Sequence, residues 1–185
     1  MPAVYQAAWL FPVDQPPLRR GYLTVENGRV VELSVSAPSS GEVLDLGDIA
    51  ILPRPINAHT HLEFSDLEAP LGAPRQPFAQ WIADVLATRA SRTAPKSNAI
   101  SRGQAELAAS LACGVGEIAS PPVSLEDYAA PDPAAPLSGV IFHELISTDY
   151  DRGAERLAEI ASLADRWPAN SPFQFGLSPH APYTL

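Results

Sequence analysis

The chain has 185 residues, of which 46% are hydrophobic and 18% charged, a composition that supports a folded core and excludes a largely disordered protein. Acidic residues outnumber basic ones by 21 to 12, and the resulting net charge of −9 argues against binding nucleic acid through its phosphates. The single cysteine, Cys113, excludes a disulfide framework, and the absence of a signal peptide or of a run approaching the ~20 apolar residues of a membrane span predicts a cytoplasmic protein.

The first fifty residues have the pattern of antiparallel β-strands. Two strand-like runs flank Asn27-Gly28, a dipeptide that supplies the positive φ angles of a two-residue type I′ hairpin turn. The expected strands cover residues 4–11, 22–26, 29–34 and 43–46. Residues 1–50 therefore form the first predicted unit.

From about residue 51 the pattern changes to strands that alternate with helices. Apolar residues recur at helical spacing from Phe78 to Leu86, and Gly114 is expected to stop a second helix. The expected helices cover about 15 residues from Phe78, residues 99–113 and a segment around 157–167. The expected strands lie at 55–58, 115–119, 139–146 and 173–178. This alternation predicts a parallel α/β architecture over residues 51–185, with four strands that make half of an eight-stranded barrel.

His59 and His61 come directly after the first of these strands. Alternate residues of a strand point to one face, so the two imidazoles can converge on one metal ion at the carboxyl end of the strand, where barrel enzymes place their sites. Two histidines at an exposed strand end are the alternative interpretation. His180 follows the fourth strand between Pro179 and Pro182, which make the turn rigid, and it either lies at the same end of the sheet or is simply solvated.

Three further polar residues lie in or shortly after the predicted strands. Glu63 follows His61 by two residues and reaches either the same pocket or the loop that follows. His143 and Glu144 are adjacent in the third strand, so their side chains are expected on opposite faces and in structural roles. The acidic residues are otherwise scattered without a long run of like charge, which is typical of solvated surfaces.

These motifs together resemble the amidohydrolase superfamily. Residues 51–63, ILPRPINAHTHLE, look like its strand-one motif, in which Leu-Pro-Gly and an apolar pair precede Asn-Ala-His-Thr-His. Residues 176–184, GLSPHAPYT, are similar to the strand-four segment of the metal-dependent aminohydrolase and chlorohydrolase branch. Phe64-Ser65 and the Phe78-x-x-Trp81-Ile82 pattern make the chain resemble the aminodeoxyfutalosine or S-adenosylhomocysteine deaminase-like members in particular.

The resemblance implies a fold, a reaction and roles for four residues. Residues 51–185 would form strands 1–4 of a (β/α)8 TIM-type barrel, and residues 1–50 part of a small β-sandwich. His59 and His61 match the first two ligands of a zinc ion, or alternatively of iron or another divalent transition metal. His180 and Glu63 match positions beside the substrate. The implied reaction is hydrolysis of a C–N bond, the deamination of a purine-like or other N-heterocyclic amine by a metal-activated water.

The sequence departs from the family pattern at two points. Arg54 stands where glycine is usual, which alters the approach to the first strand and leaves the histidines intact. The strand-five ligand, the catalytic glutamate and the strand-eight aspartate have no counterpart, so no catalytic residue is expected in this chain. Because catalytic zinc normally has three protein ligands, the chain is expected to be an incomplete and inactive part of such an enzyme.

Two other functions fit the same residues. The chain can be a non-catalytic half-barrel that associates with a partner or with a second copy, because open sheet edges favour association. It can also belong to an amide or halide hydrolase of the same superfamily, with the same metal and a different pocket. For the enzymatic readings, the expected partner is a small-molecule substrate rather than nucleic acid or membrane.

Overall fold

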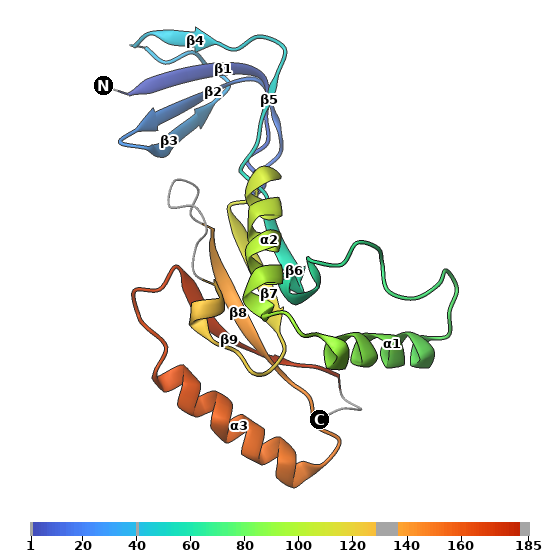
Figure 1. Cartoon of the computed structure of the whole chain (residues 1–185). Helices are drawn as coiled ribbons and strands as arrows, with labels where there is room; N and C mark the ends of the chain where they lie inside the picture. Colours follow the sequence, from blue (N-terminus) through green and yellow to red (C-terminus); the bar gives the residue numbers. More distant parts are fainter. Residues whose placement is uncertain (1, 40, 129–136, 182–185) are drawn as a thin grey trace. The chain divides into compact units, whose positions relative to one another are not determined.

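The computed structural model describes residues 2–39, 41–128 and 137–181. They form two compact units, divided between Arg54 and Pro55, and each unit contains one β-sheet (Figure 1). The division lies four residues beyond the end of the predicted first unit. None of the helices in the described residues has both the length and the apolar character needed to cross a membrane.

The first unit is a five-stranded sheet. Its strands are β1 (Ala3–Leu10), β2 (Leu18–Glu26), β3 (Arg29–Ser34), β4 (Val43–Asp45) and β5 (Ala50–Ile51), in the order β3-β2-β1-β4, with β5 also paired to β1. At the β2–β3 turn Asn27 and Gly28 have φ angles of 51° and 74°, as the predicted type I′ turn requires. The expectation of purely antiparallel strands was wrong, because β4 and β5 pair parallel to β1. Parallel pairing needs a crossover, and here the β2–β3 hairpin intervenes between β1 and its parallel neighbours.

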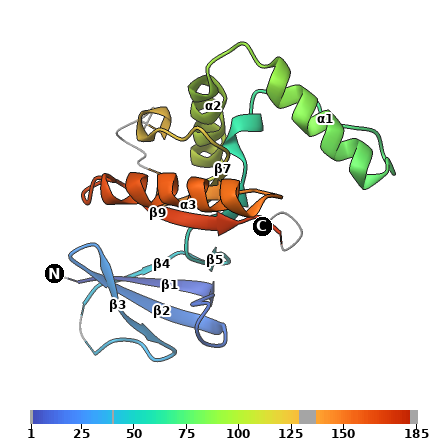
Figure 2. The same ribbon diagram turned by 90° about the horizontal axis from the view of Figure 1, so that it is seen from below.

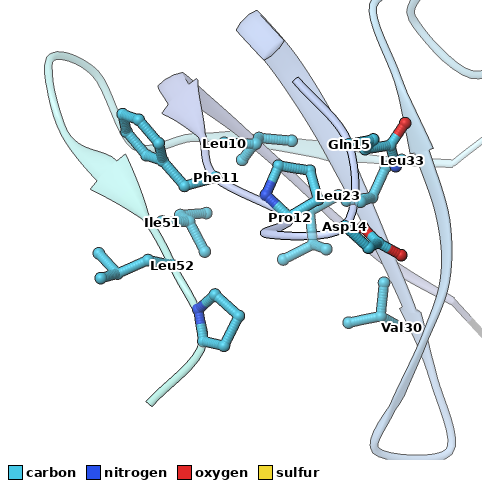
Figure 3. Close-up of a pocket in the computed structure, with 11 residues that line it drawn as sticks. Leu10, Phe11, Pro12, Asp14, Gln15, Leu23, Val30, Leu33, Ile51 and Leu52 are labelled. Carbon is cyan, nitrogen blue, oxygen red and sulfur yellow. The ribbon is translucent and has the colours of Figure 1, made fainter. Parts of the chain in front are cut away.

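One face of this sheet carries an apolar cavity of about 370 Å³. Leu10, Leu23 and Leu33 extend into it from three strands, and Ile51 and Leu52 border it from the end of the unit (Figure 3). Leu52 is 63% exposed, so this face is not sealed by the described residues of the unit. Within its own residues the unit is a single sheet layer, and the β-sandwich stays a prediction.

The second unit is a parallel α/β structure, which confirms the predicted class. Its sheet has the order β6-β7-β8-β9, and every neighbouring pair is parallel. The strands are β6 (Ile56–Thr60), β7 (Gly114–Ala119), β8 (Ser138–Leu145) and β9 (Phe173–Pro179). The helices are η1 (Leu62–Phe64), α1 (Phe78–Ser91), α2 (Lys96–Ala109), η2 (Leu125–Tyr128) and α3 (Tyr150–Asp165), of which η1 and η2 are single 3₁₀ turns (Figures 1 and 2).

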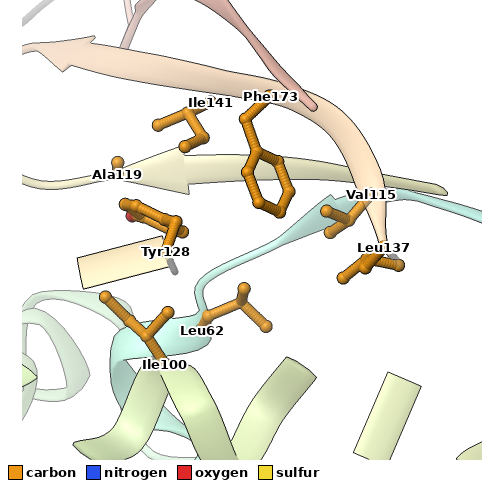
Figure 4. Close-up of a cluster of buried hydrophobic side chains, with 8 residues drawn as sticks. All are labelled: Leu62, Ile100, Val115, Ala119, Tyr128, Leu137, Ile141 and Phe173. Carbon is orange, nitrogen blue, oxygen red and sulfur yellow. The ribbon is translucent and has the colours of Figure 1, made fainter. Parts of the chain in front are cut away.

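The core of this unit lies between the sheet and the elements η1, α2 and η2. Every residue of β7 is buried, and Ile141 and Phe173 of the next two strands are at most 1% exposed. Figure 4 shows Leu62 and Ile100 meeting the rings of Tyr128 and Phe173 across this layer. The sheet is therefore held by a packed hydrophobic core, which fixes the positions of the carboxyl ends of its strands.

Two predicted boundaries were wrong. The second helix begins at Lys96, directly after Pro95, and ends at Ala109 instead of Cys113. Gly114 does not stop it, because the left-handed conformation that ends the helical path falls on Leu111, with φ of 63°, and Gly114 is the first residue of β7. The predicted 121–136 loop contains η2, and residues 129–136 lie outside the described residues.

His143 and Glu144 face opposite sides of the sheet, as expected. The imidazole of His143 stacks on Phe175 at 4.3 Å and meets Trp167 edge-on at 5.6 Å. Its Nε2 is buried and finds no hydrogen-bond partner within the described part of the chain. Burial lowers the pKa of His143 from 6.5 to about 4, so the ring is held neutral in an aromatic cluster.

This buried histidine makes stability depend on pH. The unfolded chain binds the proton more readily than the folded chain, so the free energy of unfolding should fall as the pH drops from 6.5 towards 4. Between pH 7 and pH 5 the expected loss from this group is about 2 kcal/mol. His143→Phe, which suits the aromatic surroundings, should remove that part of the loss in urea unfolding. Equal losses in wild type and variant would contradict the assignment.

Candidate functional site

A cavity of about 630 Å³ lies at the carboxyl ends of the parallel strands. Its polar lining consists of His59, His61, Arg89, Glu144, Ser178 and His180. His59 lies in β6, and His61 is the first residue after that strand. Glu144 lies in β8, Ser178 lies in β9, and His180 directly follows β9. The structure thus brings three of the four predicted site residues, His59, His61 and His180, around one space.

The two histidines converge although the strand that carries them is irregular. β6 ends at Thr60, and its register with β7 shifts between Asn57 and Thr60, so simple alternation along a strand does not explain the arrangement. The imidazole centroids of His59 and His61 are 5.4 Å apart, with their planes at 78°. Nδ1 of His61 is buried and has no hydrogen-bond partner in residues 2–39, 41–128 and 137–181. A buried ring nitrogen without a partner suits a ligand position.

The electrostatics of His61 also suit a metal ligand. Burial lowers the pKa of His61, and the carboxylate of Glu144 opposes that shift. The neutral imidazole is the form that binds a metal. Within the described residues, however, no group of three or more His, Cys, Asp or Glu side chains is arranged to hold a metal ion. The residues present therefore fit two ligand positions of a metal site.

An apolar wall faces the polar lining. It is built by η1, the following loop and α1, through Phe64, Leu67, Leu71, Trp81, Ile82 and Val85. Val85 is the only buried residue of α1, which extends away from the sheet in both views (Figures 1 and 2). The apolar stripe predicted for this helix is present. Its residues Trp81, Ile82 and Val85 line the cavity and do not belong to the core cluster.

A chain of hydrogen bonds connects this wall to the sheet through Arg89. Its Nη2 donates to Oε1 of Glu63 at 2.8 Å and to Oγ of Ser120 at 2.7 Å. Ser120 Oγ in turn donates to Oε2 of Glu144 at 3.2 Å. Glu63 itself does not line the cavity, because its carboxylate is buried against Arg89. A direct substrate contact by Glu63 stays a prediction, and the contact that the structure shows is with α1.

Glu117 holds the backbone directly after His61. Its Oε2 accepts the N–H of Leu62 at 2.9 Å, and its Oε1 accepts the hydroxyl of Tyr128 at 3.3 Å. Burial raises the pKa of Glu117 to about 8. Glu117 is only 1% exposed, which corrects the expectation that the scattered acids are solvated. Glu63 and Glu144 are likewise buried, each 5% exposed.

Sequence reasoning missed Arg89, Ser120 and Glu144 as parts of the site. Arg89 follows Val85 by four residues and therefore lies on the same face of α1 as the apolar stripe. A charged residue on that face was a signal, present in the sequence, that Arg89 has a partner there. A second signal was an acidic residue within an otherwise apolar strand, Glu117 in GVGEIA and Glu144 in VIFHEL, because a buried acid needs a polar partner. Nothing local indicated that Ser120 would connect the two.

The chain is similar to known deaminases. No protein-family model matches it. It is 30% identical over 160 residues to the aminodeoxyfutalosine deaminase of Deinococcus radiodurans, which covers 85% of this chain and 36% of that protein. The resemblance to the amidohydrolase superfamily is confirmed.

Solved structures of such deaminases have the same fold. An aminofutalosine deaminase of Helicobacter pylori with methylthio-coformycin matches with a TM-score of 0.70 and 22% identity, over 99% of this chain and 45% of that one. An adenosine deaminase from Xanthomonas campestris with bound zinc matches with a TM-score of 0.67 and 19% identity, over 99% and 44%. The chain therefore spans less than half the length of these relatives.

The ion pair of Arg89 should be important for stability. Arg89→Met leaves the carboxylate of Glu63, 7% exposed, without its partner, and we expect a loss of about 2–3 kcal/mol in urea unfolding. Arg102→Met is the matched control, because its pair with Glu106 is exposed by 55% and 61%. That variant should lose less than about 0.5 kcal/mol. Similar losses in both variants would show that Arg89 does not hold the wall.

Proposed function

We propose that this chain supplies the first four strands of a (β/α)8 barrel and part of the metal site of a hydrolase that deaminates a purine-like or other N-heterocyclic amine. The observation that carries the proposal is the cavity shared by His59 and His61, at the end of β6, and by His180, directly after β9. The 30% identity to a deaminase over most of the chain supports the same reaction class.

The metal would be held by His59 and His61, with its remaining ligand from residues beyond those described. Zinc suits two imidazoles, and iron or another divalent transition metal would fit the same donors. When bound, such an ion lowers the pKa of water and polarises the carbon under attack. Because the described residues offer two histidines and no third ligand, we propose that the isolated chain has little or no turnover.

The other residues of the cavity bind and shield the heterocycle. Trp81 and Phe64 belong to the apolar wall, and aromatic rings of this kind pack favourably against a flat heterocycle. The same wall excludes water from the space above the histidines. Ser178 and His180 approach from β9 and offer polar groups to the far side of the ligand, while Glu63 acts through Arg89 to position the wall.

Zinc binding tests this proposal directly on the 185-residue chain. By isothermal titration calorimetry at pH 7.5 we expect one zinc site, weakened at least about tenfold in His59→Ala and in His61→Ala, because each variant removes one of two ligands. Binding should weaken at acid pH, because a protonated imidazole cannot act as a zinc ligand.

His143→Phe is the matched control, because it removes an imidazole from the opposite face of the same sheet. It should leave the zinc affinity unchanged. Zinc binding that survives both alanine variants, or that His143→Phe also abolishes, would refute a metal site at His59 and His61.

A second candidate function is association without catalysis. Among the described strands, β6 and β9 each pair on one side only, which leaves two edges of a parallel sheet available. Such edges favour pairing with another chain. If association is the function, sedimentation velocity should show a dimer or larger species that grows with concentration. A monomer over the whole accessible concentration range would contradict this candidate.

A further inference from the structure

Glu144 is a buried carboxylate with one oxygen in use and one available to the cavity. It is 5% exposed, it lies on β8, and it lines the same space as His59 and His61. Its Oε2 accepts the hydroxyl of Ser120 at 3.2 Å. In the part of the chain that the structure describes, Oε1 accepts no hydrogen bond. An ionised carboxylate offers only acceptors, so this oxygen calls for a donor.

The charges around the cavity make that donor a specific requirement. Arg89 is the basic residue of the lining, and it is already paired with Glu63 and bonded to Ser120. Glu144 therefore contributes negative charge that no cation of the lining contacts directly. A ligand group that donates a hydrogen bond is favoured there, and a group that only accepts is opposed.

Glu144 lies in the part of the cavity near the two histidines. Its side chain lines the same cavity as His59 and His61, and its carboxylate opposes the lowering of the His61 pKa by burial. The reacting carbon of a deamination substrate must sit beside the metal site, and the amino group is attached to that carbon. The amino group would therefore lie near the carboxylate of Glu144.

We propose that Glu144 is a specificity-determining residue that accepts a hydrogen bond from the exocyclic amino group of the heterocyclic amine. The inference rests on the proposed function for the class of ligand. Ser120 and Arg89 are positioning residues, because their hydrogen bonds hold Oε2 and thereby turn Oε1 to the cavity. The site thus selects amines over analogues that lack the amino group before any chemistry takes place.

Ligand binding by the 185-residue chain tests the inference without metal or turnover. The probes are adenosine and purine riboside, which differ only in the exocyclic amino group. In a sample with labelled isoleucine methyl groups and a metal chelator, nuclear magnetic resonance should show shifts at the three cavity residues, Ile82, Ile118 and Ile146. Ile141 and Ile160 lie outside the cavity lining and serve as internal references.

Wild type should bind adenosine at least about tenfold more tightly than purine riboside, the effect of one hydrogen bond to a charged group. In Glu144→Gln the amide oxygen can keep the bond from Ser120 while its NH₂ replaces the free acceptor, so the preference should fall within about twofold. Glu159→Gln on the exposed face of α3 makes the same charge change and should keep the wild-type preference.

A second variant guards against misfolding of the first. Ser120→Ala removes the bond that positions Glu144 and should reduce the preference for adenosine, with the cavity methyl spectrum otherwise retained. Equal affinities of the two probes for wild type, or an unchanged preference in Glu144→Gln, would overturn the inference. In that case the proposed zinc site at His59 and His61 would be unaffected. Conversely, a preference for adenosine that depends on Glu144 would support the inference even if the chain bound no zinc.

Discussion

The hydrogen-bonded ion pair between Arg89 and Glu63 is the interaction on which the cavity depends. α1 buries only Val85, so apolar packing does not hold it in place. Arg89 contacts Glu63 and Ser120, and Arg92 contacts Asp66 and the carbonyl oxygen of Glu63. These charge-assisted bonds fasten the carboxyl-terminal end of α1 to the turn that follows His61. The bonds of Arg89 and Arg92 thus position the apolar wall, the backbone that follows His61 and, through Ser120, the carboxylate of Glu144.

The same turn is supported from below by Glu117. Burying an acid is unfavourable unless its oxygens find donors, and here the N–H of Leu62 and the hydroxyl of Tyr128 provide them. The high pKa of this group, about 8, reflects how completely the core surrounds it. The core and the cavity are therefore not separate features, because Tyr128 packs against Phe173 while it bonds the residue that holds Leu62.

Much of the fold followed from local patterns. The Asn27-Gly28 turn could be predicted because only certain residues accept two successive positive φ angles. The parallel strands could be predicted because their apolar runs alternate with helices. The end of α2 could not, since Leu111 takes a left-handed conformation that its side chain disfavours, and the parallel pairing of β4 and β5 depends on a crossover that no short window contains.

The sequence by itself determined the kinds of element, the parallel class and the candidate residues His59, His61 and His180, because periodicity and motif spacing are local properties. Only the tertiary structure decided which of them meet. It paired Glu63, whose position had left two alternatives open, with Arg89, and it placed Glu144, which was expected in a structural role, in the cavity lining. The reason is that burial and hydrogen-bond partners depend on contacts between residues that are far apart in the sequence. Residues 63, 89, 120 and 144 become neighbours only when the ends of three strands and one helix are brought together.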